Sequence, residues 1–312
     1  MNDQLFAGYR RALLLMLFVV VLSGMARAAE RPRVYVGLPP QRWLVQQLAS
    51  NRVEIGLLLA PGQNPHTFEP AARQVKEMVA ADGYLLMGLP FERALLQKLR
   101  AVNPGLRVFD LTQGIPRREQ SGQAHVGHGG AAEDHDDGCG AADPHVWLTP
   151  AGMGIMASNA AVALSALDPA GREWYEVRRV ACQQACAQLD AELRALLAPV
   201  RGGLMLTYHA SWGYFADAYG LRQVAVEAEG RPPTARQLAA LMDLAMQEQV
   251  RYVFTEPPYD PKPCRTVARQ IGAEVAVIDP LAEAWDRNLR AIAAQVRKAL
   301  ERPPARQEGQ MP

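Results

Sequence analysis

The chain has 312 residues, and its 33 basic and 32 acidic side chains leave a formal net charge of +1. This balance, with no clustered run of basic residues, argues against a protein that binds nucleic acid. The 4 cysteines are too few and too widely spaced for a fold held together by disulfides, and the sequence leaves their redox state open.

Residues 1–28 have the pattern of a secretory signal peptide. Arg10 and Arg11 precede an apolar run that is too short to span a bilayer as a helix, and Ala26-Arg27-Ala28 then offers a cleavage site. We therefore expect export to the periplasm. We also expect a mature chain that is not embedded in the membrane and is a monomer.

In the first half of the mature chain, short apolar runs alternate with amphipathic stretches, which is typical of α/β folds. The strands expected there are 33–38, 53–59, 84–87 and 107–110. The helices expected between them are 41–50, 71–80 and 91–100.

The second half repeats this alternation. Thr234 and Gln237 form a capping box for a helix in this half. The strands expected there are 204–208, 222–226, 251–255 and 274–278. The sequence therefore predicts two α/β lobes, each with a four-stranded parallel sheet flanked by helices.

One long helix is expected to join the two lobes. Asp168 is a suitable N-cap, Pro169 suits the first helical position, and no helix breaker follows before Pro199. We therefore divide the mature chain into a lobe at 29–167, a rigid linking helix at 168–198, a lobe at 199–301 and a disordered tail at 302–312.

Four residues stand where side chains from both lobes could meet. His66, His209 and Asp279 each follow an expected strand, and His145 lies in the connection that leads to the linking helix. The carboxyl ends of parallel strands form the edge where α/β sheets bind ligands. A single histidine in such a loop is more often a surface or capping residue, but three imidazoles and a carboxylate together form a ligand set that suits tetrahedral zinc.

At these residues the chain resembles the zinc and manganese receptors of ABC transporters, the cluster A-I family of solute-binding proteins. Nearly the whole mature chain shares the resemblance. The motifs that carry it are NPHTFEP around His66, DPHVWLTP around His145, YHASWGYFADAYGL around His209, and FTEPPYDPKP followed by IDPLAE around Asp279.

The resemblance implies that His66, His145, His209 and Asp279 bind Zn²⁺, which the protein delivers to a membrane permease as cargo. Glu256 in the same segment is a candidate hydrogen-bond partner for a ligand histidine. Manganese stays open as the cargo, because receptors with this ligand set have been assigned to more than one metal.

Two further possibilities follow from the residues. An exported mononuclear zinc hydrolase could use the same ligands if water replaced Asp279, although Glu256 is then the only candidate general base. The loop at 117–142 carries His125, His128 and His135 among carboxylates and glycines, and we expect it to bind zinc weakly.

Overall fold

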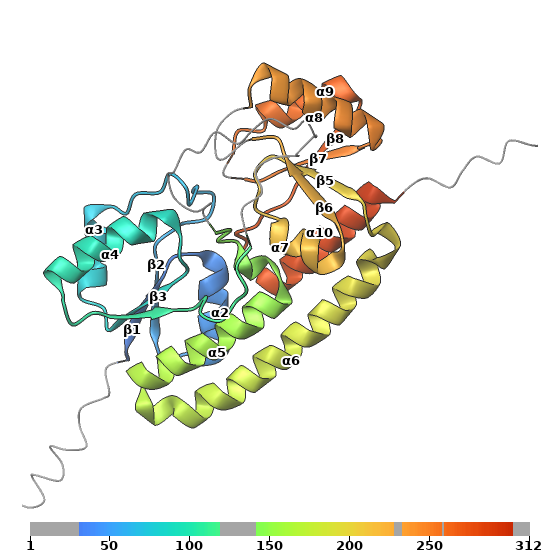
Figure 1. Cartoon of the computed structure of the whole chain (residues 1–312). Coiled ribbons are helices and arrows are strands. Elements are labelled where there is room, and N and C mark those ends of the chain that lie inside the picture. Colours follow the sequence, from blue (N-terminus) through green and yellow to red (C-terminus); the bar gives the residue numbers. More distant parts are fainter. Residues whose placement is uncertain (1–30, 119–141, 228–232, 258, 302–312) are drawn as a thin grey trace, which may run out of the picture.

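The computed structural model describes residues 31–118, 142–227, 233–257 and 259–301. The expected signal peptide, the tail at 302–312, and the loop residues His125, His128 and His135 therefore lie outside the described residues. The remaining chain forms two α/β lobes that lie side by side along a pair of long helices (Figure 1).

The first lobe contains one parallel sheet in the order β2-β1-β3-β4. Its strands are β1 Arg33–Val36, β2 Glu54–Leu57, β3 Gly83–Leu86 and β4 Arg107–Asp110. Its helices are α2 Pro39–Ala49, α3 Ala72–Val79 and α4 Pro90–Val102. All four expected strands are present, and their bounds shift by no more than two residues.

The second lobe repeats this winding, with a parallel sheet in the order β6-β5-β7-β8. Its strands are β5 Leu204–Thr207, β6 Arg222–Ala225, β7 Tyr252–Thr255 and β8 Glu274–Val277. Its helices are α7 Gly213–Tyr219, α8 Ala235–Gln247, α9 Lys262–Ile271 and α10 Trp285–Leu300. In both sheets the strand order reverses at the first strand, which is where α/β sheets open a crevice for ligands.

The linking helix is α6, Arg172–Leu197, and it runs past both lobes (Figure 1). Its 26 residues span about 39 Å at 1.5 Å per residue. Asp168 and Pro169 do stand at the N-cap and the first helical position, but of a 3-10 turn, Pro169–Gly171, that leads into α6, and the Asp168 side chain makes no capping hydrogen bond. Its carboxylate instead accepts hydrogen bonds from Arg52 Nε and the Tyr175 hydroxyl, each at 2.8 Å. These bonds tie the start of α6 to the first lobe.

A second long helix, α5 Pro150–Leu167, packs along α6 and was not expected from the sequence. Among the helices of the described residues, it is the one long and apolar enough to cross a membrane by length and composition. Half of it is buried within the protein. Asn159 on this helix donates hydrogen bonds to the carbonyls of Leu111 and Gln113, at 2.8 and 2.9 Å. These contacts identify α5 as a core helix.

The larger of two hydrophobic cores contains residues of both lobes, and the smaller one lies within the second lobe. Trp147 and Trp285 are fully buried in it and link the two halves of the chain. Trp147 Nε1 donates to the carbonyl of Pro280 at 2.8 Å, and Trp285 Nε1 donates to the carbonyl of Trp147 at 2.7 Å. A wide hinge opening would break these buried hydrogen bonds, so we expect only small movements between the lobes.

Candidate metal centre

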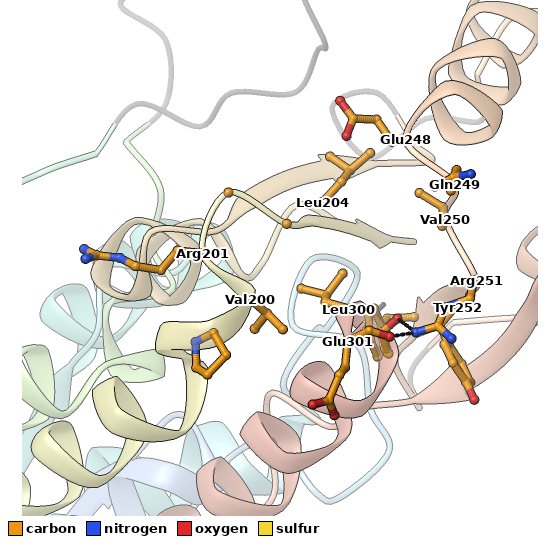
Figure 2. A pocket seen from close by; sticks show the side chains of 15 residues that line it. Val200, Arg201, Leu204, Glu248, Gln249, Val250, Arg251, Tyr252, Leu300 and Glu301 are labelled. Carbon is orange, nitrogen blue, oxygen red and sulfur yellow. Dashed lines mark hydrogen bonds between the residues drawn. The ribbon is translucent and has the colours of Figure 1, made fainter. Parts of the chain in front are cut away.

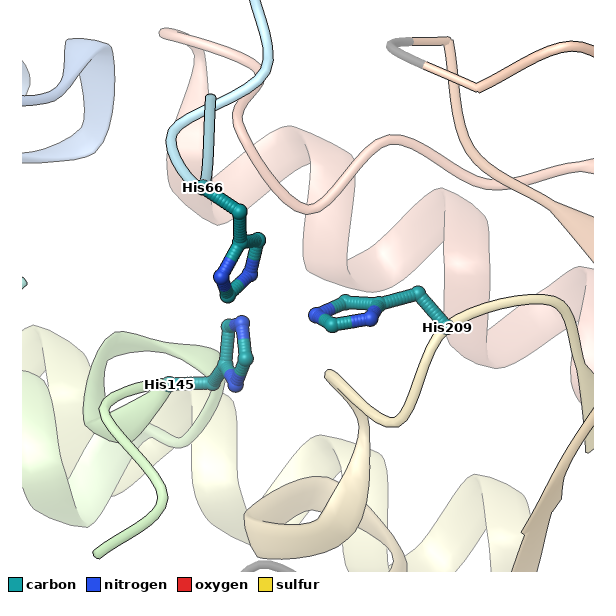
Figure 3. Close-up of side chains that lie close together, drawn as sticks. All are labelled: His66, His145 and His209. Atoms are coloured by element: carbon teal, nitrogen blue, oxygen red, sulfur yellow. The ribbon is translucent and has the colours of Figure 1, made fainter. Parts of the chain in front are cut away.

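Three imidazoles from distant parts of the sequence converge between the lobes (Figure 3). The ring centroids of His66 and His209 are 4.6 Å apart, those of His145 and His209 5.3 Å, and those of His66 and His145 5.9 Å. One nitrogen of each ring lies within 4.8 Å of the others, and this is a geometry that can hold a metal ion. The structure thus brings together all three histidines that the sequence singled out.

The carboxyl edge of the second sheet supplies one side of this centre. The strand order places Glu227, His209, Glu256 and Asp279 after β6, β5, β7 and β8, respectively. The backbone at His209 is fixed to the sheet, because its carbonyl accepts a hydrogen bond from Thr207 Oγ1 at 2.8 Å. Four polar residues therefore follow the strands at one edge of this sheet.

Glu227 holds the imidazole of His209. A carboxylate oxygen of this buried residue is hydrogen-bonded to His209 Nδ1. The other ring nitrogen, Nε2, is buried and has no hydrogen-bond partner among the described residues. A buried polar atom without a partner costs stability, so this nitrogen is poised to bind a ligand such as a metal ion.

Asp143 does the same for His145. Its Oδ1 lies 2.7 Å from His145 Nδ1 and also accepts the backbone N–H of His145 at 3.0 Å. Asp143 is fully buried, and Arg118 lies 3.4 Å from its second oxygen. The carboxylate thus orients the ring so that Nε2 is the nitrogen left to bind a metal.

His66 is the exposed member of the group and comes from the first lobe. Its position depends on a turn in which Asn64 Oδ1 accepts the backbone N–H of His66 at 2.8 Å. The ring itself faces the other two imidazoles. Removal from water there, and repulsion from the protonated forms of His209 and His145, lower its pKa to about 3.

Burial also lowers the pKa of His145, although the hydrogen bond to Asp143 acts in the opposite direction. A lowered pKa keeps an imidazole neutral at the pH of most cells and growth media. Only the neutral form has a lone pair for a metal ion, so protons compete weakly for His66 and His145 near pH 7.

Asp279 is not part of the cluster in which the three histidines meet. It lies at the same sheet edge, half-buried, and its Oδ1 accepts the backbone N–H of Leu281 at 2.8 Å. Burial raises the pKa of its carboxyl group. The sequence therefore placed Asp279 at the correct edge, and its role as a ligand stays a prediction.

Glu256 is fully buried but does not contact an imidazole side chain. Its Oε1 accepts hydrogen bonds from Trp212 Nε1 at 3.2 Å and from Ser211 Oγ at 3.3 Å, and the backbone of His209 also binds it. The hydrogen bond of Glu256 reaches the backbone of His209 rather than its ring, and Glu227 is the carboxylate bonded to the ring, so the expected support of a ligand histidine by Glu256 stays a prediction. Glu256 fixes the turn that carries His209.

The buried Glu256 carboxyl also predicts how stability depends on pH. Burial raises its pKa from 4.5 to about 8, so the metal-free folded protein holds this proton more tightly than the unfolded chain does. The stability from this group is complete below about pH 4.5 and is lost as pH rises to about 8. We expect Glu256→Gln, which cannot ionise, to raise the midpoint of thermal unfolding at pH 8 and to change it little at pH 5.

At about 1.4 kcal/mol per pKa unit, the upper limit of this gain is on the order of 5 kcal/mol. Thermal unfolding of metal-free protein at the two pH values measures it. The exposed Glu274→Gln is the matched control and should show no such dependence on pH. An equal effect of Glu256→Gln at pH 5 and pH 8 would show that the carboxyl does not titrate as described.

The comparisons with known proteins agree on one family. The model of the family described as ZnuA, zinc-uptake complex component A, periplasmic, matches residues 34–300. The chain is 28% identical over 284 residues to the high-affinity zinc uptake system protein ZnuA of Paracoccus denitrificans, covering 83% of this chain and 86% of that protein.

The chain is also 25% identical over 276 residues to the zinc-binding protein AdcA of Streptococcus pyogenes serotype M3, which covers 85% of this chain. It spans only about half of AdcA, 53% of its length. Among solved structures, a ZnuA deletion mutant with zinc bound superimposes with a TM-score of 0.79 at 33% identity, over 88% of this chain and 100% of that chain. Because the family model covers both lobes, the helix between them and all three converging histidines, this chain belongs to the ZnuA family of periplasmic zinc-uptake components.

Proposed function

We propose that this protein binds one zinc ion between its lobes in the periplasm and delivers it to the permease of an ABC-type importer. The observation that carries the proposal is the convergence of three imidazoles, two of which are oriented by buried carboxylates, while the buried Nε2 of His209 has no hydrogen-bond partner in the described part of the chain. Zinc accepts imidazole nitrogen readily and tolerates mixed nitrogen and oxygen ligands. The relatives from Paracoccus denitrificans and Streptococcus pyogenes are named for zinc uptake and zinc binding, which supports the same cargo.

In this proposal Asp279 is the fourth ligand. Two nitrogens bound to tetrahedral zinc at about 2.0–2.1 Å lie roughly 3.3 Å apart. The ring nitrogens here lie within 4.8 Å of one another, so the three rings need to move inward by only about 1 Å when the ion binds.

The metal content of protein purified without chelator or affinity tag tests the proposal directly. We expect one tightly bound zinc per chain and displacement of manganese by zinc in a competition titration. Three imidazoles favour zinc over manganese, because carboxylate and water oxygens suit the harder ion. Purified protein that carries manganese and keeps it against zinc would overturn the assignment of the cargo.

An exported zinc hydrolase is the second candidate, and the site supports it less well. A hydrolase needs a general base beside the metal-bound water. Glu256 is turned toward Ser211 and Trp212, while Glu227 and Asp143 are engaged with the imidazoles. We therefore propose a binding protein, and the family to which it belongs is one of uptake components. Zinc-dependent cleavage of ester or peptide probes would contradict this.

We further propose that the loop with His125, His128 and His135 binds a second zinc ion loosely and collects metal for the site between the lobes. Ordering a glycine-rich segment costs roughly 1–2 kcal/mol per residue fixed, which keeps such binding weak. We expect deletion of residues 121–140 to remove one weak zinc equivalent in calorimetry and to leave the tight one. Unchanged stoichiometry after deletion would rule out the collecting role, and loss of the tight site would mean that the loop supplies a primary ligand.

A further inference from the structure

A second group of metal-binding side chains lies on α6, away from the three imidazoles. Cys182 and Cys186 are one helical turn apart, both in the free thiol form, and only 7% and 4% exposed. They line a pocket of about 210 Å³ that is bounded by α2, α6 and the start of α10. The two buried thiols therefore border the same pocket at the surface of α6.

The helix prevents the obvious product of two neighbouring thiols, a disulfide. Residues four apart on an α-helix have their Cβ atoms about 5–6 Å apart, whereas a disulfide needs about 3.5–4.5 Å. Cys182 and Cys186 lie within the uninterrupted helix α6, which would have to unwind locally to form the bond. A metal ion bound between the two sulfurs needs no direct sulfur–sulfur bond, so both cysteines can bind it while the helix stays intact.

The ligand set selects the class of ion. Thiolates are soft ligands that favour soft cations such as Cu(I). Structural zinc needs four ligands, and no group of three or more metal-binding side chains includes these cysteines among the described residues. A monovalent soft cation that accepts two sulfurs in a nearly linear arrangement has no such requirement. The site is therefore complete for Cu(I) or Ag(I) and incomplete for zinc.

The charge around the pocket also suits this product. Binding of Cu(I) releases both thiol protons and leaves a bis-thiolate complex with a net charge of −1. Arg178 and Arg290 both line the pocket. Arg290 already pairs with Glu192 at 2.8 Å and with Asp286, another lining residue, at 3.3 Å, whereas Arg178 lies over the ring of Trp174 at 5.1 Å. Arg178 is therefore the guanidinium that can offset the charge of a bound anionic complex.

The two thiols differ in how readily they lose a proton. The hydrogen bond from Cys186 lowers the pKa of Cys182, and the pKa of Cys186 is raised by this hydrogen bond and by burial. Cys182 is thus the sulfur that would bind an incoming cation first. Once Cu(I) is bound there, its positive charge favours loss of the second proton from Cys186.

We propose that Cys182 and Cys186 form a binding site for one soft monovalent cation, Cu(I) in the cell, at the junction of α6 with both lobes. This site is separate from the zinc site of the proposed function and takes a different class of metal. If the two cysteines did not bind Cu(I), the proposed zinc site would be unaffected, because the two sites share no ligand.

The test is an anaerobic titration of zinc-loaded, reduced full-length protein with Cu(I) against a competing Cu(I) chelator. We expect one tight Cu(I) equivalent that is lost in the Cys182→Ser, Cys186→Ser double variant and weakened at least about 100-fold in each single variant, since one of two bonds is removed. Cys264→Ser and Cys139→Ser are the matched controls and should retain that equivalent. The proposal fails if the double variant binds Cu(I) with the stoichiometry and affinity of the unmodified protein.

X-ray absorption on the unmodified protein with one Cu(I) equivalent gives a second result that does not depend on how the variants fold. We expect two sulfur neighbours around copper and no nitrogen neighbours. A nitrogen or oxygen shell would overturn the proposal, because it would place the ion on histidines instead. Zinc content and unfolding midpoint, measured on each variant, should match those of the unmodified protein.

Discussion

Replacement of His66, His145 or His209 by alanine is expected to weaken zinc binding by about 100- to 1000-fold in each case. Zinc sites with four protein ligands have apparent binding free energies of about 10–16 kcal/mol, so one ligand accounts for roughly 3–4 kcal/mol. The two buried histidines, His145 and His209, should show the larger losses, because alanine there also leaves a buried carboxylate without its partner. Competition titration with a zinc chelator measures each constant.

Asp279→Ala should cost less than any of the three histidine variants. Water can replace the carboxylate and leave three imidazoles around the ion, whereas a lost imidazole leaves a gap between two lobes that the shared core holds in place. His125→Ala in the loop is the control and should retain the tight affinity. A histidine variant of the cluster that bound zinc as well as the unmodified protein would remove that residue from the ligand set.

The strands could be predicted well because local sequence and tertiary packing agree there. All eight lie in short apolar runs, and because the strands are parallel, β5 and β8 end on one edge. The rule that α/β sheets bind ligands at the carboxyl ends of their strands located His209 and Asp279 without any knowledge of packing. His66 needed more than this rule, because a turn fixed by Asn64 brings it back toward the other lobe.

The features that the sequence did not reveal depend on contacts far along the chain. Asp168 looks like a helix cap, but its carboxylate is taken by Arg52, 116 residues earlier. Helix α5 is apolar on most sides, because it is covered by other elements, and so it lacks the one-sided pattern that marks a surface helix. The sequence of α5 therefore has no amphipathic pattern from which the helix could be predicted.

Two functional residues were missed although the sequence held a sign of each. Asp143 stands two residues before His145, a spacing that lets one carboxylate oxygen bind both the backbone and the ring of the histidine. Glu227 follows β6, the neighbour of β5, at the same edge as His209. A search of the residues that follow every strand of the second sheet would have identified Glu227 as well as Glu256.

These two carboxylates matter because they act on the metal through the imidazoles. Each one accepts a hydrogen bond from Nδ1, fixes the tautomer with a free Nε2 and makes that nitrogen a better electron donor. Replacement of Asp143 and replacement of Glu227 should differ in their effect on stability. Asp143 also faces Arg118, which pairs with Asp217 of the second lobe, whereas no such ion pair is described for Glu227.

We therefore expect Glu227→Ala and Asp143→Ala each to weaken zinc binding by about 10- to 100-fold. The shape-preserving variants Glu227→Gln and Asp143→Asn should weaken it by only about 10-fold. The amide oxygen can still accept the hydrogen bond from Nδ1 but has no charge to strengthen the imidazole. Asp143→Asn should in addition lower the midpoint of thermal unfolding of metal-free protein, because Arg118 loses a buried partner, while Glu227→Gln should lower it less. Chelator competition measures the first effect and calorimetry the second, with Glu248→Gln on the far side of the lobe as control. Wild-type zinc affinity in both alanine variants would mean that the carboxylates serve only to pack the histidines and do not tune the metal site.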